Sequence, residues 1–361
     1  MRQYAGDGSR WIKKRYAPPG YAGGAGEPAL LETVKGARAG GSVRLAPELV
    51  VAACLAGLIA QTIPLAKDWD AIRQGRNDFP AFYLCPRLLG TGQLYDQAAF
   101  LTEQARILGR TNANIQFVRL PYVAVMLAPL SRLPFSAAYA LWQALSIAAL
   151  AVFSWLWPGR RALTAVILCW YPAVGANLAN AQDVAFLLLA VAIVAALVRR
   201  GRDVGAGLVL ALCAAKIHIC LFLPVLIVGR RTWRLGAGFA AGLTVLLAVS
   251  FAAAGMSWPA AWLQAIGSPL VSPHIAKSSL LAFAAEAVHG PALWAIAGGL
   301  ILAVGAGVFI VSRRSSFVLG LGAALAGGLL VAFHVYAQDY LLALPLILTC
   351  VSELRRERGA G

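Results

Sequence analysis

The feature that most constrains this chain is a series of long apolar runs separated by short clusters of arginine. Five such clusters lie at residues 160–161, 199–202, 230–234, 313–314 and 355–358. Only 13% of the residues are charged and 60% are hydrophobic, whereas a typical soluble domain carries about 25% charged residues. Because so few charges cannot cover a globular surface, we interpret the chain as an all-α, polytopic membrane protein.

The net charge of +16 would indicate a nucleic-acid partner if the protein were soluble. Here, however, the basic residues lie mainly in short segments between apolar runs, which is the placement that the positive-inside rule expects of cytoplasmic loops. We therefore predict that these clusters set the topology of the chain, and that its partners include membrane lipids but no nucleic acid.

Eight apolar runs are predicted to cross the hydrocarbon core, which takes about 20 helical residues. They lie at residues 47–66, 135–157, 162–178, 182–199, 235–254, 290–312, 316–333 and 338–352. A ninth run, at 203–229, carries Lys216 and His218 at its middle. A lysine near the bilayer centre is costly, so we expect two half-helices there that meet near the outer face. The total is about ten spans.

The run at 117–133 is short and interrupted by proline and arginine. If it crossed the membrane, every later basic cluster would lie outside, so we interpret it as a juxtamembrane or re-entrant helix pair at the outer face. Both termini are then cytoplasmic. We divide the chain into a basic, disordered tail (1–45), one transmembrane domain (46–352) and a cytoplasmic tail (353–361).

The most polar patterned segment, residues 77–96, directly follows the first span and contains Asp78. A lone aspartate in a loop is often only a turn or N-cap residue. Asp68 and Asp70, just before it, could coordinate a divalent cation or could equally begin a helix. The three aspartates are predicted on the same outer face, and position alone does not separate them.

Further polar residues converge on that face. Ionisable residues inside a membrane protein indicate a functional site, so Lys216 and His218 are candidate phosphate ligands, against the alternative of a snorkelling structural lysine. His334 and Tyr336 belong to a polar block between two apolar runs, where a buried structural histidine is the ordinary interpretation. The turn between the third and fourth spans holds amide and carboxyl side chains suited to sugar hydroxyls, although polar turns are common. They are Asn180, Gln182 and Asp183.

Several blocks, in order along the chain, resemble glycosyltransferase family 87, whose bacterial members use polyprenyl-phosphate donors and have the GT-C membrane fold. The first is N-D-F-P-A-F-Y-L-C-P-R-L-L-G-T-G-Q-L-Y-D at 77–96, and the others lie at 127–142, 180–183, 215–224 and 334–345. The resemblance covers about residues 47–352. The chain departs from the family at 117–122, where it has F-V-R-L-P-Y in place of a Tyr-x-Pro-Pro stretch, and at 216–218, where K-I-H replaces Lys-Pro.

The resemblance implies a GT-C-like domain with juxtamembrane helices at the outer face of the cell membrane. The implied reaction moves a hexose, with mannose favoured, or a pentose from a polyprenyl monophosphate to a hydroxyl of a lipid-linked or glycan acceptor. Asp78 would be the general base, and Lys216, His334, His218 and Arg119 would stabilise the leaving phosphate. The sugar and the acceptor would contact Asn180, Gln182, Asp183, Tyr83 and Tyr336.

Cations alone can stabilise a monophosphate leaving group, so we predict no cofactor and no metal, with Asp68 and Asp70 as the reservation. Two other classes of protein remain open. A transporter or flippase would also have about ten spans, although it should show internal repeats, which are not visible here. A non-catalytic scaffold would leave the convergence of polar residues on one face unexplained.

Overall fold

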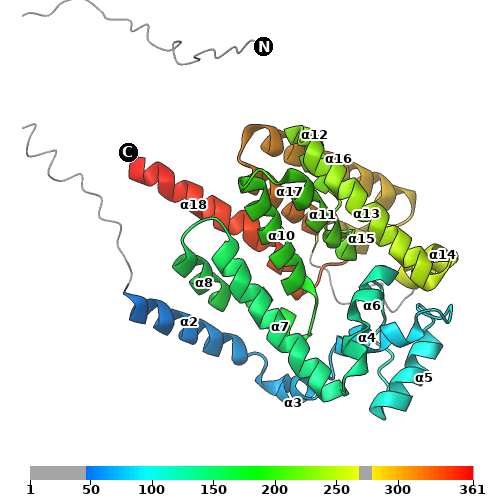
Figure 1. Ribbon diagram of the computed structural model, residues 1–361. Coiled ribbons are helices and arrows are strands. Elements are labelled where there is room, and N and C mark those ends of the chain that lie inside the picture. The colour runs from blue at the N-terminus through cyan, green and yellow to red at the C-terminus, as the bar shows by residue number, and fades with distance from the viewer. Residues whose placement is uncertain (1–45, 268–278, 361) are drawn as a thin grey trace, which may run out of the picture. The chain divides into compact units, whose positions relative to one another are not determined.

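The computed structural model describes residues 46–267 and 279–360. Throughout these residues the regular elements are α-helices and short 3-10 helices without a strand, which confirms the predicted all-α class (Figure 1). The predicted tail at residues 1–45 lies outside the described residues.

Among the described residues, four helical segments are long and apolar enough to cross a membrane. They are α7 (Phe135–Leu156), α13 (Trp233–Ala254), α16 (Pro291–Arg314) and Ala337–Leu354, which combines η5 (Ala337–Ala343) with most of α18 (Leu344–Ala360). A fifth candidate is the pair α8 (Arg161–Trp170) and α9 (Pro172–Ala179), which is bent by 62°. Shorter apolar helices are α2 (Pro47–Thr62), α10 (Val184–Arg199) and α17 (Phe317–Val331). The protein is therefore a membrane protein, while the count of about ten crossings stays a prediction.

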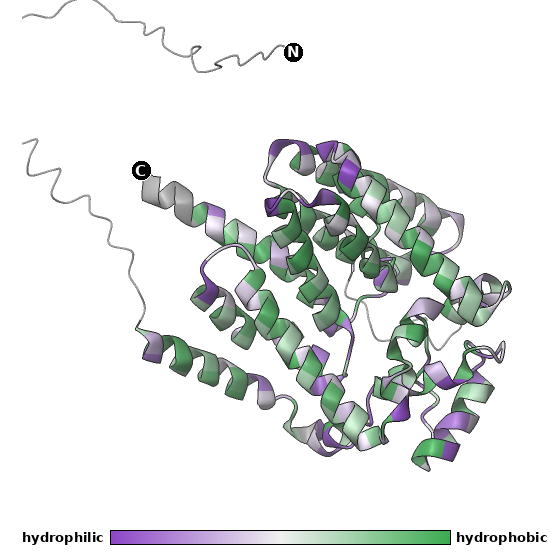
Figure 2. Cartoon of the chain, viewed as in Figure 1, coloured by the Kyte–Doolittle hydropathy of each residue, from purple (hydrophilic) through white to green (hydrophobic). Residues whose placement is uncertain are grey.

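Hydropathy follows this division of the chain. Figure 2 shows hydrophobic residues along most of the length of α7, α10 and α13, and hydrophilic residues mainly in the connections between helices. Several large apolar side chains on these helices are exposed, among them Leu145 and Ile147 on α7 and Val245 on α13. Such surfaces suit contact with lipid.

The run at 203–229 is broken as predicted. It forms α11 (Asp203–Leu210), then η4 (Ala211–Lys216), and after a turn α12 (Leu223–Arg230). α17 packs closely against the turn, because a Cβ atom added to Gly328 would collide with the carbonyl group of Ile219. A small residue on α17 thus supports the non-helical backbone that follows Lys216.

The loop between α2 and α7 consists of short helices, none of them long enough to span a bilayer. They are η1 (Ala66–Asp68), α3 (Trp69–Arg73), α4 (Phe79–Leu84), η2 (Cys85–Leu88), α5 (Gln97–Leu108), α6 (Pro121–Leu127) and η3 (Leu130–Arg132). Their ends follow ordinary capping chemistry. Asp96 caps α5 by accepting hydrogen bonds from the backbone N–H groups of Ala98 and Ala99, and Gly109 ends the helix at φ 63°. This arrangement fits the predicted juxtamembrane helices.

The bend between α8 and α9 is stabilised by a side chain of α2. Gln61 donates from Nε2 to the carbonyl oxygen of Cys169 (2.5 Å), and its Oε1 accepts from the backbone N–H of Gly175 (2.6 Å). These two backbone groups lie on either side of the break before Pro172. In an apolar surrounding, backbone groups at a break need such partners.

We therefore expect Gln61→Leu to destabilise the protein, because it leaves two backbone groups without partners at about 1–3 kcal/mol each. The measurement is thermal unfolding of the purified protein in one detergent. Thr62→Ala is the matched control, since the Thr62 hydroxyl donates to the carbonyl oxygen of Ile59 within its own helix. Equal stability of Gln61→Leu and wild type would show that the bend does not need this amide.

Candidate active site

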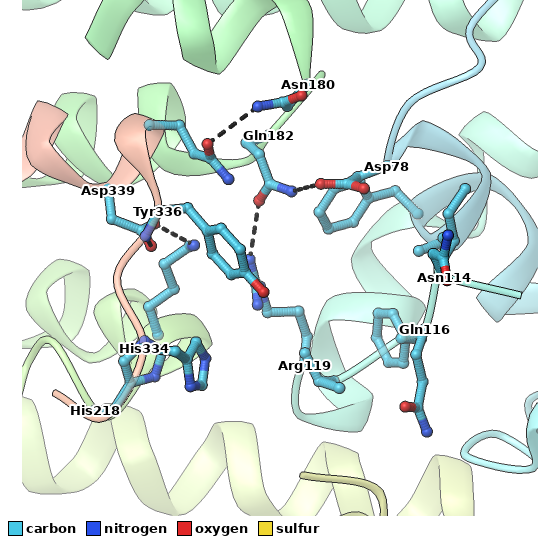
Figure 3. Close-up of a pocket in the computed structure, with 17 residues that line it drawn as sticks. Asp78, Asn114, Gln116, Arg119, Asn180, Gln182, His218, His334, Tyr336 and Asp339 are labelled. Carbon is cyan, nitrogen blue, oxygen red and sulfur yellow. Dashed lines mark hydrogen bonds and ion pairs between the residues drawn. The ribbon is translucent and has the colours of Figure 1, made fainter. Parts of the chain in front are cut away.

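A polar cavity of about 310 Å³ lies where five separate segments of the chain meet. Figure 3 shows side chains from these segments directed toward a common space. Eight of the predicted site residues line it. They are Asp78, Arg119, Asn180, Gln182, Lys216, His218, His334 and Tyr336. The predicted convergence of these polar residues is therefore present in the fold.

Asp78 occupies the N-cap position of α4, but its side chain makes no capping bond. Instead its Oδ2 accepts a hydrogen bond of 2.5 Å from Nε2 of Gln182. The helix behind it is fixed by aromatic packing, in which the buried ring of Phe79 lies 5.2 Å from Tyr139 and 6.0 Å from Trp142. The structure thus aims this carboxylate at the cavity rather than at its own helix.

Burial raises the pKa of Asp78 above its ordinary value. The hydrogen bond from Gln182 and the positive charges of Arg119 and Lys216 act in the opposite direction, and the carboxylate of Asp183 adds to the rise. A carboxylate with a raised pKa is a stronger base than an exposed aspartate.

Arg119 and Asp183 form a buried, bidentate ion pair. Nε of the guanidinium lies 2.8 Å from Oδ2 of the carboxylate, and Nη2 lies 3.0 Å from Oδ1. The same Nη2 donates to Oε1 of Gln182 at 3.2 Å. Asp183 was predicted as a sugar or acceptor ligand, but it does not line the cavity, and its two oxygens are used by Arg119.

Lys216 is paired as well. Its side chain is only 4% exposed, and the ammonium group donates to Oδ1 of Asp339 at 2.6 Å and lies 4.0 Å from Asp183. Oδ2 of Asp339 accepts from the backbone N–H of Tyr336 at 3.0 Å. The lysine is therefore held inside the protein by an ion pair and does not snorkel to a surface.

Two imidazole rings stand beside this lysine. His218 and His334 lie with ring centroids 4.9 Å apart, and the ring of Tyr336 follows at 6.0 Å from His334 (Figure 3). Burial lowers the pKa of His334 below its ordinary value. That imidazole is then neutral at neutral pH and can donate one N–H without adding charge.

Other cavity residues were missed as site residues in the sequence. Asn114 and Gln116 come from the long loop and carried no sequence signal, whereas Gln338 and Asp339 lie in the polar block with His334, which pointed to them. Gln338 accepts at Oε1 from Nδ2 of Asn180 at 3.1 Å. The block at 334–339 therefore contributes four residues to the cavity, of which His334 and Tyr336 were predicted.

Three predicted residues lie elsewhere. Tyr83 is buried in the aromatic layer behind Asp78, and its hydroxyl donates to the carbonyl oxygen of Leu133 at 2.7 Å. Asp68 and Asp70 are exposed, and Asp70 lies 3.3 Å from Arg73. Among the described residues, no three His, Cys, Asp or Glu side chains are grouped so that they could hold a metal ion.

A model of one protein family, described as glycosyltransferase family 87, matches residues 120–345, which is more than half of the chain. The chain belongs to glycosyltransferase family 87. This family 87 protein is thus a membrane glycosyltransferase, an enzyme with a sugar donor and an acceptor. No curated protein and no solved structure matches it. The matched residues include Lys216 and Asp339, whereas Asp78 and Arg119 precede them.

Because Asp339 is 1% exposed, removing its partner leaves a buried charge uncompensated. We expect Lys216→Met to cost about 3–5 kcal/mol of stability, and the double variant Lys216→Met with Asp339→Asn to cost less than the two single variants added together. Unfolding of the purified variants in one detergent measures this. Arg73→Ala, which breaks an exposed pair, serves as control and should change little. Additive effects of the two buried substitutions would contradict the pairing.

Proposed function

We propose that this family 87 protein transfers a hexose or pentose, with mannose favoured, from a polyprenyl monophosphate to an acceptor hydroxyl at the outer face of the cell membrane. The acceptor is a lipid-linked or glycan hydroxyl. The observation that carries the proposal is the placement of the Asp78 carboxylate in one cavity with Lys216, His218 and His334.

Asp78 is the proposed general base. Only one of its oxygens, Oδ2, is hydrogen-bonded to a side chain in the part of the chain that the structure describes. Oδ1 is left to accept the proton of an acceptor hydroxyl, which requires an oxygen–oxygen distance of about 3 Å. The cavity volume of about 310 Å³ lies at the lower end of the range of about 300–1,000 Å³ for small-molecule pockets, which suits a sugar phosphate head group.

The proposed step is a displacement at the anomeric carbon. The acceptor oxygen forms a bond to that carbon as its proton moves to Asp78, and the bond between the carbon and the phosphate oxygen breaks with its electron pair on the phosphate. The leaving polyprenyl phosphate gains one negative charge. Lys216 keeps ammonium hydrogens beyond the one given to Asp339, and His218 and His334 can each donate an N–H bond to the same phosphate.

Sugar transfer in proteoliposomes tests the proposal. Labelled polyprenyl-phosphate mannose, glucose and arabinose are offered as donors with a lipid extract as acceptor. We expect Asp78→Asn to lower transfer by at least on the order of 10³-fold, because it removes the base and keeps the side-chain shape. Asp70→Asn, on the exposed surface, is the matched control and should remain active. An active Asp78→Asn, or a wild type inactive with every donor, would refute this assignment.

The pH dependence provides a second test. Asp78 acts as base only when ionised, so kcat/KM should fall as the pH falls through its pKa. Because burial raises that pKa, the acid limb should lie above the value of about 3.9 for an unperturbed aspartate. The measurement is kcat/KM against pH in proteoliposomes that remain intact over the range. An acid limb at or below the ordinary aspartate value would contradict the role of a buried carboxylate.

A further inference from the structure

We propose that Arg119 and Gln182 are positioning residues, which together orient the Asp78 carboxylate so that one of its oxygens stays free for the acceptor hydroxyl. This inference rests on the proposed function, because it assigns a role to the neighbours of the proposed base. It removes Arg119 from the predicted phosphate ligands and Gln182 from the predicted sugar ligands.

The contacts form one continuous network, and Figure 3 shows the part of it that joins Arg119, Gln182 and Asp78. Asp183 holds the Nε and Nη2 side of the Arg119 guanidinium at 2.8 and 3.0 Å. Nη2 also donates to Oε1 of Gln182, and Nε2 of Gln182 donates to Oδ2 of Asp78. Gln182 therefore bridges a cation and the base.

This bridge has only one workable orientation. A guanidinium has hydrogen-bond donors but no acceptor, and a carboxylate has acceptors but no donor when it is ionised. The amide oxygen of Gln182 must then face Arg119, and the amide nitrogen must face Asp78. If the amide were flipped, it would set nitrogen against the guanidinium and oxygen against the carboxylate, losing both bonds. Arg119 thus fixes which group of Gln182 meets the base.

Buried aromatic side chains hold Arg119 and the turn before Gln182 in place. Arg119, 9% exposed, lies 5.9 Å from the centre of the Phe82 ring, and its backbone carbonyl accepts from the hydroxyl of Tyr95 at 2.8 Å. Ala181, just before Gln182, is buried and has a φ of 50°, a left-handed conformation that costs about 1–2 kcal/mol for a residue other than glycine. Its carbonyl oxygen accepts from Nε1 of Trp142 at 2.9 Å. Such strain persists where the surrounding structure imposes it, and it is frequent at functional sites.

The competing interpretation makes Arg119 a phosphate ligand, as Lys216 is proposed to be. The two interpretations differ in which hydrogen-bond donors remain available for a phosphate. Nε and Nη2 of Arg119 are engaged by Asp183 and Gln182, so a phosphate would have to compete with a carboxylate or use Nη1 alone. Lys216, in contrast, has one close partner and lies beside the two histidines.

The test compares Gln182→Leu and Arg119→Lys with the control Gln143→Leu. Gln143 is also an amide close to the turn, since it donates to the carbonyl oxygen of Leu178 and to the hydroxyl of Tyr139, but it does not contact Asp78. The charged and titratable groups that act on Asp78 include Arg119, Lys216, Asp183 and Tyr336, and the same cavity also holds His218, His334 and Asp339. The variants at 182 and 143 leave all of these groups in place.

Two readouts are needed. The first is kcat and donor KM, with kcat/KM followed against pH. The second is an infrared titration of the carboxyl C=O band of the purified protein, assigned to Asp78 by its loss in Asp78→Asn, which requires no activity. We expect Gln182→Leu to lower kcat by on the order of 10²-fold through misplacement of the base, with donor KM unchanged.

Since the Gln182 hydrogen bond and the Arg119 charge both lower the pKa of Asp78, losing the bond should move the acid limb and the infrared midpoint to higher pH. Arg119→Lys keeps the positive charge but cannot bond to Asp183 and Gln182 at the same time as a guanidinium does. It should therefore move the two Asp78 midpoints to higher pH by a smaller amount. Gln143→Leu should leave both midpoints in place.

An unchanged infrared midpoint in Gln182→Leu would overturn the inference, and so would a donor KM that rises in Arg119→Lys without any shift. A wild type that transfers no sugar would refute the proposed function, while the infrared titration would still decide whether Gln182 controls Asp78.

Discussion

The arrangement of this protein depends on the pairing of two cations that lie inside it. An unpaired charge in such a surrounding is far too costly, so each cation needs a carboxylate from another part of the fold. Lys216 pairs with Asp339, 123 residues away in sequence, and Arg119 pairs with Asp183, 64 residues away. These bonds join the break after α11 to η5, and the loop before α6 to the start of α10. The walls of the cavity are thus the same segments that the ion pairs bring together.

Pairing also decides which carboxylate is chemically available. Asp183 uses both oxygens on Arg119, and Asp339 uses its oxygens on Lys216 and the backbone of Tyr336. Asp78 meets a neutral amide instead of a cation. Its proton affinity is consequently set by burial, which raises the pKa, against the Gln182 hydrogen bond and the more distant positive charges, which lower it.

The sequence predicted the helical class, the interruption after Lys216 and eight of the twelve polar residues that line the cavity, because each has a local signal. It did not predict the bend of 62° inside the run at 162–178, which was expected to be one span. Lys216 stood out as a charge in an apolar run, and Asp78 as an acid just beyond a span. Pairing has no local signal, so Arg119 was assigned to phosphate and Asp183 to sugar, although they bind each other. Tyr83 was grouped with the sugar ligands because it lies near Asp78 in sequence, but the helical turn of α4 directs it into the aromatic layer. Asn114 and Gln116 reach the cavity through a loop whose path depends on tertiary contacts.

Interrupted helices are what allow side chains from neighbouring positions to face one cavity. In a regular α-helix, residues two positions apart point about 200° apart, so Lys216 and His218 would lie on nearly opposite faces and could not both line the same space. Here η4 ends at Lys216, Ala181 is left-handed before Gln182, and η5 is a 3-10 helix that begins beside Tyr336. Irregular backbone in an apolar protein is tolerated only where other parts of the protein shelter it, which Gly328 and the ion pairs provide. His218 follows Lys216 at one of these interruptions and lines the same cavity.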